Sequence, residues 1–181
     1  MKEHWDLEEK VGYKKYKYND TEINILIDQK NNHIALMIMK RISDFIDNIA
    51  YNINKNFHKL PLNIVHGALL FILIHPHRYS LFEIPPNSMF LGLNKPKFVY
   101  TDLLLPSVGK DKRLKATERY LFLQLRNKNG QFKNQKEIFD TLIHELVHTM
   151  ANHVTWREDD HGSDFIKYNK FLTNFCNLML K

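Results

Sequence analysis

The chain has 181 residues and a formal net charge of +6; 44% of its residues are hydrophobic and 25% are charged. This length suits one domain, residues 1–181, with a real core, and the composition excludes an intrinsically disordered chain. The first ten residues lack the apolar run of a secretory signal, and the longest apolar stretch, Ile64 to Ile74, is too short to span a bilayer. The single Cys176 cannot form an internal disulfide, which suits a reducing compartment. Together these features predict an intracellular protein (cytoplasm or nucleus) with no membrane partner.

The first half of the chain predicts two strands followed by two helices. The strands are expected at Val11 to Tyr18 and at Ile23 to Asp28, where isoleucines alternate. Apolar residues recur at helical spacing from Ile34 to Ile53, and a second helix is expected within Leu62 to Leu73. His75-Pro76-His77 would end that helix, and we interpret it as a loop because no third metal ligand is near in sequence. Nothing in residues 1–88 assigns a role to them.

The second half predicts two strands, a turn and two helices. Strands are expected at Phe98 to Leu104 and at Tyr120 to Arg126, and Asn129-Gly130 is typical of a turn. A closing helix is expected from about Ser163 to Leu180, with Cys176 as one of its core residues. The predicted fold class is α+β, with a small mixed sheet packed on the helix that precedes this closing helix.

That preceding helix carries the pattern His144-Glu145-Leu146-Val147-His148, which reads H-E-x-x-H. Asn134 followed by Glu137 predicts its start, since an N-cap and an acid three residues later form a capping box. Residues four apart share one helix face, so His144 and His148 can bind one Zn²⁺ while Glu145 reaches a water. The alternative is a pair of core histidines satisfied by hydrogen bonds. The rest of the helix is largely apolar, and a buried polar stripe of this kind favours the metal.

A zinc site needs at least a third ligand. We favour His161, because it follows a polar loop and Gly162 can turn the chain back toward the metal. His153 would point about 140° away from His148 on a continuing helix, so it and Glu158 rank behind His161. Three nearby acids could orient the ligand imidazoles or form only a solvated loop: Asp159, Asp160 and Asp164.

Three strings in the second half resemble the WLM-domain metalloproteases: Phe90 to Asn94, Leu121 to Arg126 and Ile138 to His148. The tail His161-Gly162-Ser163-Asp164-Phe165 is more similar to the related SprT-like proteases, which carry H-G-x-x-F there. The resemblance covers residues 89–175. It implies a small zincin-like peptidase, often acting on DNA-attached proteins, with ligands His144, His148 and His161 and general base Glu145. The insertion from Lys95 to Tyr120 is longer than expected of a WLM domain.

Positive charge is concentrated just before the H-E-x-x-H helix. Between Lys110 and Lys136, nine basic residues stand against two acidic ones, a net charge of +7. The nine are Lys110, Lys112, Arg113, Lys115, Arg119, Arg126, Lys128, Lys133 and Lys136. A nucleic-acid backbone is the partner that such a segment predicts, and a solvated basic face is the alternative.

These observations predict peptide hydrolysis with DNA-associated or DNA-crosslinked proteins as substrates. Zn²⁺ would lower the pKa of a water whose proton Glu145 takes. The strand Leu121 to Leu125 could bind the substrate by edge pairing, and Tyr168 and Arg157 are oxyanion candidates by position only. Two other readings stay open: a non-catalytic zinc-stabilised nucleic-acid-binding protein, and a generic peptidase unrelated to DNA. A deformylase-like site would need a cysteine upstream of the motif, and the chain has none there.

Overall fold

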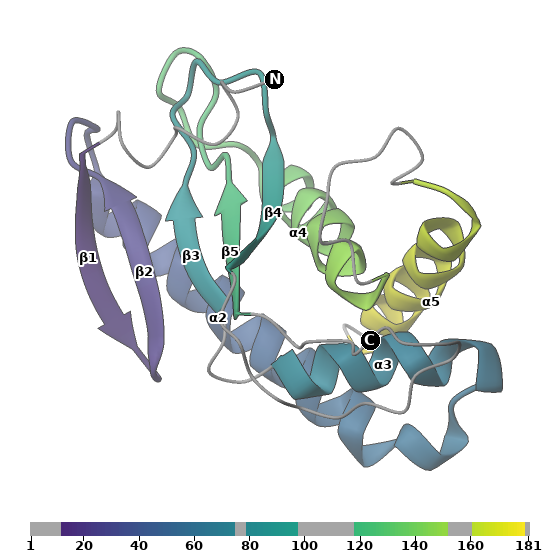
Figure 1. Cartoon of the computed structure of the whole chain (residues 1–181). Coiled ribbons are helices and arrows are strands. Elements are labelled where there is room, and N and C mark those ends of the chain that lie inside the picture. The colour runs from purple at the N-terminus through teal and green to yellow at the C-terminus, as the bar shows by residue number, and fades with distance from the viewer. Residues whose placement is uncertain (1–11, 75–78, 98–117, 152–160, 180–181) are drawn as a thin grey trace.

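The computed structural model describes residues 12–74, 79–97, 118–151 and 161–179 (Figure 1). Five strands form one sheet in the order β1-β2-β3-β5-β4. Strands β2, β3 and β5 run parallel to one another, whereas β1 and β4 pair antiparallel with β2 and β5. The strands are β1 (Tyr13–Tyr18), β2 (Thr21–Leu26), β3 (Tyr79–Glu83), β4 (Gly92–Lys97) and β5 (Glu118–Leu123).

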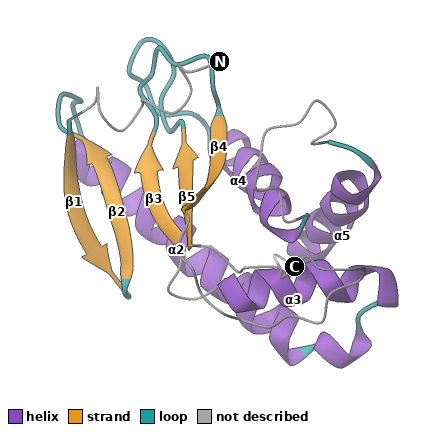
Figure 2. Ribbon diagram, in the orientation of Figure 1, coloured by secondary structure: helices purple, strands orange, loops and turns teal. Residues whose placement is uncertain are grey.

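The helices gather on one face of the sheet (Figure 2). They are α2 (Asn32–Lys55), the short 3-10 helix η1 (Phe57–Lys59), α3 (Leu62–Ile74), α4 (Gln135–Met150) and α5 (Ser163–Met179). Alternate residues of the central strands, such as Ile23, Leu81 and Leu121, are fully buried against them. Because side chains alternate across a strand, this pattern commits one face of the sheet to the helices. None of the described helices is long and apolar enough to cross a membrane.

The opposite face of the sheet holds a smaller, aromatic cluster. Phe82 and Phe122 stack with ring centroids 4.7 Å apart, and Tyr120 meets Phe82 edge-on at 5.4 Å. Tyr13 also packs edge-on against Phe82 and donates a hydrogen bond to the backbone oxygen of Glu83 at 3.0 Å. The same register therefore fills both faces of the sheet, which fixes the pairing of the strands.

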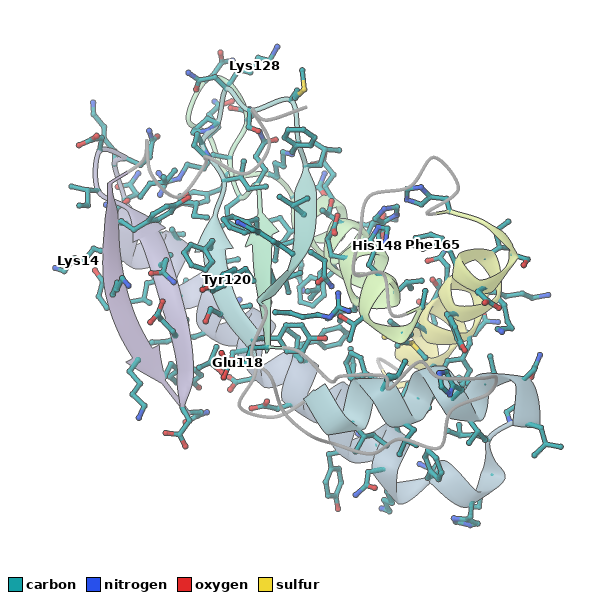
Figure 3. All side chains as sticks on the ribbon, viewed as in Figure 1. Lys14, Glu118, Tyr120, Lys128, His148 and Phe165 are labelled. Atoms are coloured by element: carbon teal, nitrogen blue, oxygen red, sulfur yellow. The ribbon has the colours of Figure 1, made fainter. Side chains whose placement is uncertain are left out.

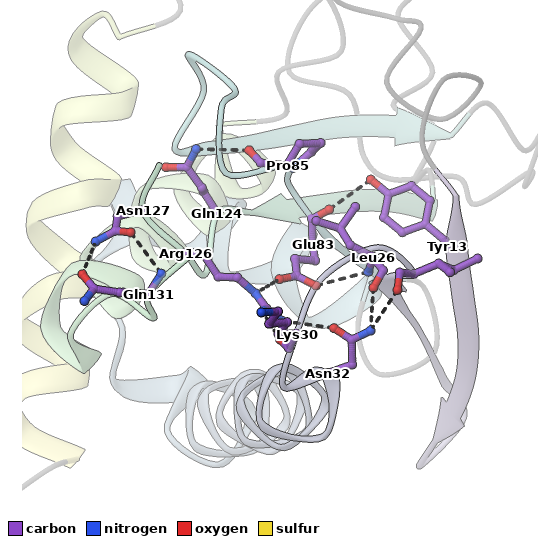
Figure 4. Close-up of polar contacts among 11 residues, drawn as sticks. Tyr13, Leu26, Lys30, Asn32, Glu83, Pro85, Gln124, Arg126, Asn127 and Gln131 are labelled. Atoms are coloured by element: carbon purple, nitrogen blue, oxygen red, sulfur yellow. Dashed lines mark hydrogen bonds and ion pairs between the residues drawn. The ribbon is translucent and has the colours of Figure 1, made fainter. Parts of the chain in front are cut away.

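A buried ion pair closes one end of the sheet (Figure 4). Arg126 Nε donates to Glu83 Oε1 at 2.7 Å, and Leu26 N donates to Glu83 Oε2 at 3.2 Å. The same guanidinium donates to the side chain of Asn32 and to the carbonyl of Lys30. Burial raises the pKa of Glu83 in spite of Arg126. The pair ties the ends of three strands to the start of α2.

Most of the predicted elements are confirmed, and the sheet is where prediction and structure differ. Residues 13–18, 21–26 and 118–123 are strands, and 32–55 and 62–74 are helices, as the spacing of apolar residues predicted. Two strands were not predicted: β3, at residues 79–83, which lies at the centre of the sheet, and β4, at residues 92–97, which lies at its edge. The expected strand Phe98 to Leu104 and the His75-Pro76-His77 loop lie outside the described residues.

Residues of the first 88 complete the sheet and helix layer into which the H-E-x-x-H helix packs. Strands β2 and β3 run parallel, so the chain must cross over between them, and α2 and α3 make that connection. Gly67 of α3 lies directly against the ring of Tyr168 in α5, where an added Cβ would be 2.4 Å from the ring. The N-terminal part is thus packed against the helix that follows His161.

Candidate metal centre

Helix α4 begins where its sequence predicts. The side chain of Asn134 accepts a hydrogen bond from Glu137 N at 2.9 Å, and Asn134 N donates to the Glu137 carboxylate at 3.2 Å. This capping box satisfies two backbone N–H groups that the helix would otherwise leave without a partner. The fixed start places His144 and His148 one turn apart on the same face of the helix.

Three histidines meet at the gap between α4 and α5. His144 Nε2 and His161 Nε2 lie 3.1 Å apart, and each of the three histidines offers a ring nitrogen within 4.8 Å of the others. The ring centroids of His144, His148 and His161 form a nearly equilateral triangle, with sides of 5.0, 5.1 and 5.2 Å. His161, predicted as the third ligand, is therefore brought to the H-E-x-x-H pair.

This donor set fits a zinc ion. Two nitrogens bound tetrahedrally at about 2.0–2.1 Å from zinc lie about 3.3–3.4 Å apart. The 3.1 Å between His144 Nε2 and His161 Nε2 is close to that value, and ring nitrogens of all three histidines lie within 4.8 Å of one another. Among the described residues three imidazoles form the donor set, and a tetrahedral zinc bound by these three alone would keep a fourth position for water.

Phe165 is the common neighbour of the three imidazoles. Its ring centroid lies 4.9 Å from His144, 4.9 Å from His148 and 4.5 Å from His161. Figure 3 shows His148 of α4 and Phe165 of α5 as neighbours. Phe165 is 5% exposed and stands in the first turn of α5. The apolar ring closes one side of the site, where His144 and His148 are half-buried and His161 is exposed, so the first two imidazoles are partly desolvated.

That desolvation favours the form of histidine that binds metals. Burial lowers the pKa of His144, and the neighbouring His161 lowers it further. A lowered pKa means that the neutral imidazole is present at a lower pH than usual, and only the neutral ring offers a lone pair to a cation.

Glu145 is buried against the edge strand β4. An added Cβ on Gly92 would lie 2.6 Å from Glu145 Oε1, 2.7 Å from its Cγ and 2.7 Å from Thr141 Cγ2. Only glycine therefore lets β4 come this close to α4. Glu145 is 6% exposed, and burial raises the pKa of its carboxyl to about 8. A carboxyl with such a pKa can bind or release a proton near neutral pH.

A chain of hydrogen-bonded polar groups, buried except for the half-buried Asn94, joins β4 to α4. Asn94 Nδ2 donates to the backbone oxygen of Glu145 at 2.5 Å and to Thr149 Oγ1 at 2.9 Å. Arg119 donates to Asn94 Oδ1 at 3.0 Å, and Tyr79 donates its hydroxyl proton to Thr149 Oγ1 at 2.9 Å. Burial lowers the pKa of Arg119 to about 10 and raises that of Tyr79 to about 12. Arg119 thus stays cationic and Tyr79 neutral at pH 7.

The loop that leads into β4 is held by the side chain of Gln124, the residue directly after β5. Gln124 Nε2 donates to the backbone oxygens of Pro85, Pro86 and Ser88 at 3.1–3.3 Å. Its Oε1 accepts from Lys133 Nζ at 2.6 Å. Sequence reasoning assigned no role to Gln124, Asn94 or Gly92. The only signal was their place in the strings that resemble WLM domains.

The other predicted site residues divide into those placed elsewhere and those not described. Asp164 accepts a hydrogen bond from Lys167 at 2.7 Å, which makes it part of a surface ion pair. Tyr168 is buried with its ring against Gly67, as expected of a packing residue rather than an oxyanion stabiliser. His153, Arg157, Glu158, Asp159 and Asp160 lie outside the described residues.

The basic segment is only partly a surface. Arg119 and Arg126 are 0% and 1% exposed, so the prediction that counts them in a basic face is wrong for these two residues. Each guanidinium is held by a partner distant in sequence, Asn94 for Arg119 and Glu83 for Arg126. Lys128 and Lys136 are exposed, and Lys133 is half-buried. Lys110, Lys112, Arg113 and Lys115 lie outside the described residues.

Comparison with protein-family models, with curated proteins and with solved structures gave no match. The resemblance to WLM and SprT-like proteases therefore remains a prediction that rests on the residues of this chain.

Proposed function

We propose that this protein is a zinc-dependent metallopeptidase of zincin-like architecture, with His144, His148 and His161 as metal ligands and Glu145 as general base. The observation that carries the proposal is the convergence of three imidazoles beside a buried carboxyl. A purely structural zinc site would not need a general base such as Glu145. Burying its carboxyl costs free energy, which favours a catalytic role for this residue.

The residues divide the work as follows. Zinc, when bound by the three histidines, supplies a Lewis acid that polarises the scissile carbonyl and makes a water more acidic. Glu145 takes the proton of that water and later delivers it to the leaving amine. Its pKa of about 8 before metal binding reflects burial, and a nearby cation would lower it and leave the carboxylate ready to accept a proton.

Strand β4 is the surface on which an extended peptide would bind. Substrate pairing was predicted at Leu121 to Leu125, and that prediction is wrong, because β5 pairs with β3 on one side and with β4 on the other. In the described part of the sheet, β4 is an outer strand, and its Gly92 lies against Glu145. Backbone pairing along β4 would bring a peptide bond past the general base with weak sequence preference.

The test is cleavage of an unfolded protein and of the chain itself by wild type and by Glu145→Gln. Asp140→Asn is the matched control, because Asp140 is an exposed acid on the same helix. We expect cleavage by wild type and the control, none by Glu145→Gln, and about one zinc per chain in all three. Zinc in every protein with no cleavage by any would favour the non-catalytic zinc-stabilised binding protein.

DNA enters the proposal through the resemblance and through the exposed Lys128 and Lys136. Each cleavage assay should be repeated with single-stranded DNA at low and at physiological salt. Stimulation that disappears at higher salt, and falls in a Lys128→Ala, Lys136→Ala double variant, supports DNA-coupled proteolysis. Cleavage that DNA leaves unchanged supports a generic peptidase instead.

A further inference from the structure

We infer that Asn94 is a positioning residue that sets the separation between the substrate-binding strand β4 and the helix α4. This inference rests on the proposed function for its catalytic consequence, but its structural part stands on contacts within the described residues. It assigns a task to a side chain that is neither one of the proposed metal ligands nor the proposed general base.

Asn94 binds α4 at the residue that carries the general base. Its amide donates to the backbone oxygen of Glu145 at 2.5 Å and to the hydroxyl of Thr149, one turn later, at 2.9 Å. Glu145 is 6% exposed and Thr149 is fully buried. In such surroundings water does not replace a lost hydrogen bond, so the two bonds resist movement of β4 away from the helix.

The direction of the Asn94 amide is fixed by its neighbours. Arg119 can only donate, so the atom it meets at 3.0 Å must be the oxygen Oδ1, and the NH2 group must face α4. Thr149 Oγ1 accepts a second hydrogen bond, from Tyr79 at 2.9 Å. The buried cation of Arg119 and the hydroxyl of Tyr79 thus hold the donor of Asn94 toward the helix.

Gly92 and Asn94 both keep the separation between β4 and α4 short, in two different ways. Gly92 removes the side chain that would push β4 away from Glu145 and Thr141, and Asn94 supplies the bonds that pull the strand in. Both residues lie on β4, two positions apart, so their side chains point to the same face of the strand. The strand is therefore held against α4 at two successive points.

The catalytic consequence concerns alignment. The metal ligands and Glu145 move together with α4 and the start of α5, whereas a bound peptide would move with β4. A change in their separation misaligns the scissile bond without removing the metal. Misplacement of about 1 Å can cost about 100-fold in rate. Loss of the Asn94 bonds should therefore lower kcat by about 10-fold or more while KM and zinc content stay near wild type.

The variants are Asn94→Asp, Asn94→Ala and the control Asn24→Ala. Asn94→Asp keeps the shape and gives Arg119 a carboxylate, but it turns a donor into an acceptor facing the oxygen of Glu145. Asn24, which is fully buried where Asn94 is half-buried, also donates to a backbone oxygen of a neighbouring element, Leu81 O at 3.3 Å, but it lies on β2. Asn24→Ala should therefore match Asn94→Ala in lost stability without affecting the site.

Two measurements decide the inference. The first is the nuclear Overhauser effect between the Gly92 Hα and Thr141 methyl protons in metal-free protein, which reports the contact of β4 with α4 directly. The second is the separation of kcat from KM. The inference is supported if both Asn94 variants show a weaker nuclear Overhauser effect between Gly92 and Thr141 and a lower kcat. Asn24→Ala should show neither change. Asn94 variants that keep both the contact and kcat would overturn it. If wild type cleaves nothing, the proposed function fails, and the proton contact alone decides whether Asn94 positions the strand.

Discussion

Replacing Gly92 by alanine tests the close approach of β4 to α4 most directly. The new methyl group would lie 2.6 Å from Glu145 Oε1, 2.7 Å from Glu145 Cγ and 2.7 Å from Thr141 Cγ2. Heavy atoms in van der Waals contact need about 3.5–4.0 Å, so all three contacts must lengthen. Neither neighbour can swing away easily, because Glu145 is buried and Thr141 is β-branched.

The expected cost combines two opposing effects. Overpacking of this kind destabilises by about 1–3 kcal/mol, whereas exchanging glycine for alanine stabilises by about 0.4–1 kcal/mol through the unfolded chain. We therefore expect a net loss of about 1–2 kcal/mol, which in a domain of this size lowers Tm by roughly 2–8 °C. The cleavage rate should fall by more than the loss of folded protein alone explains, because the strand moves away from Glu145, the proposed general base.

The assay is thermal unfolding with zinc content and peptidase rate measured on the same samples. Gly12→Ala is the control, because its added Cβ would meet Ile27 at 3.4 Å, an ordinary contact. We expect unchanged zinc content in both variants, since the three heavy atoms nearest to the Cβ added at Gly92 belong to Glu145 and Thr141 and not to the histidines. A Gly92→Ala protein as stable and as active as wild type would refute the close approach and with it the role given to β4.

Three further predictions concern His161, Glu145 and Cys176. His161→Ala should bind less zinc than wild type, with the exposed His33→Ala as control; unchanged zinc content would instead point to His153 or Glu158 as the third ligand. In metal-free protein, the pKa of Glu145 is about 8 against an ordinary 4.5, so the protonated form is favoured by folding. The raised pKa of Glu145 stabilises the folded protein fully below pH 4.5. This stabilisation is lost as the pH rises toward 8, at up to about 1.4 kcal/mol per pH unit. In urea unfolding, the stability of Glu145→Gln relative to wild type should therefore increase from pH 4.5 to pH 8. If the free energies of unfolding of the two proteins change in parallel with pH, the carboxyl of Glu145 is not buried as described. Cys176 is 1% exposed, and burial raises its thiol pKa to about 12, so a thiol reagent should label it only on unfolding; rapid labelling of folded protein would place it outside the core.

What the sequence predicted correctly depends on neighbours close along the chain. The start of α4 followed from Asn134 and Glu137, three residues apart, and the shared face of His144 and His148 followed from helical spacing. Helix α2 followed from isoleucines at the same spacing. The turn at Gly130, with φ of 77°, followed from the one residue type that adopts this conformation without strain. Local geometry fixes such features, so reading the sequence is enough.

The placement of His161 is an intermediate case. Its residue type and the following Gly162 made it the favoured third ligand, but its distance from His144 depends on how α5 packs against α4. Phe165 and Tyr168 decide that packing through contacts with the imidazoles and with Gly67. The sequence indicated the residue, and the helix packing brought it within 3.1 Å of His144.

Only the tertiary structure decided which strand is exposed and which charges are buried. Strand β5 resembled a substrate-binding edge, yet β3 and β4 pair with it on both sides. Arg119 and Arg126 looked like parts of a basic surface, yet Asn94 and Glu83, 25 and 43 residues away, hold them inside the fold. Strand order and the partners of buried charges are set by contacts between distant segments, and these leave no periodic trace in the sequence. The sequence thus placed the side chains of the H-E-x-x-H pattern on α4, and the packing of β4 against α4 decided which strand lies beside Glu145.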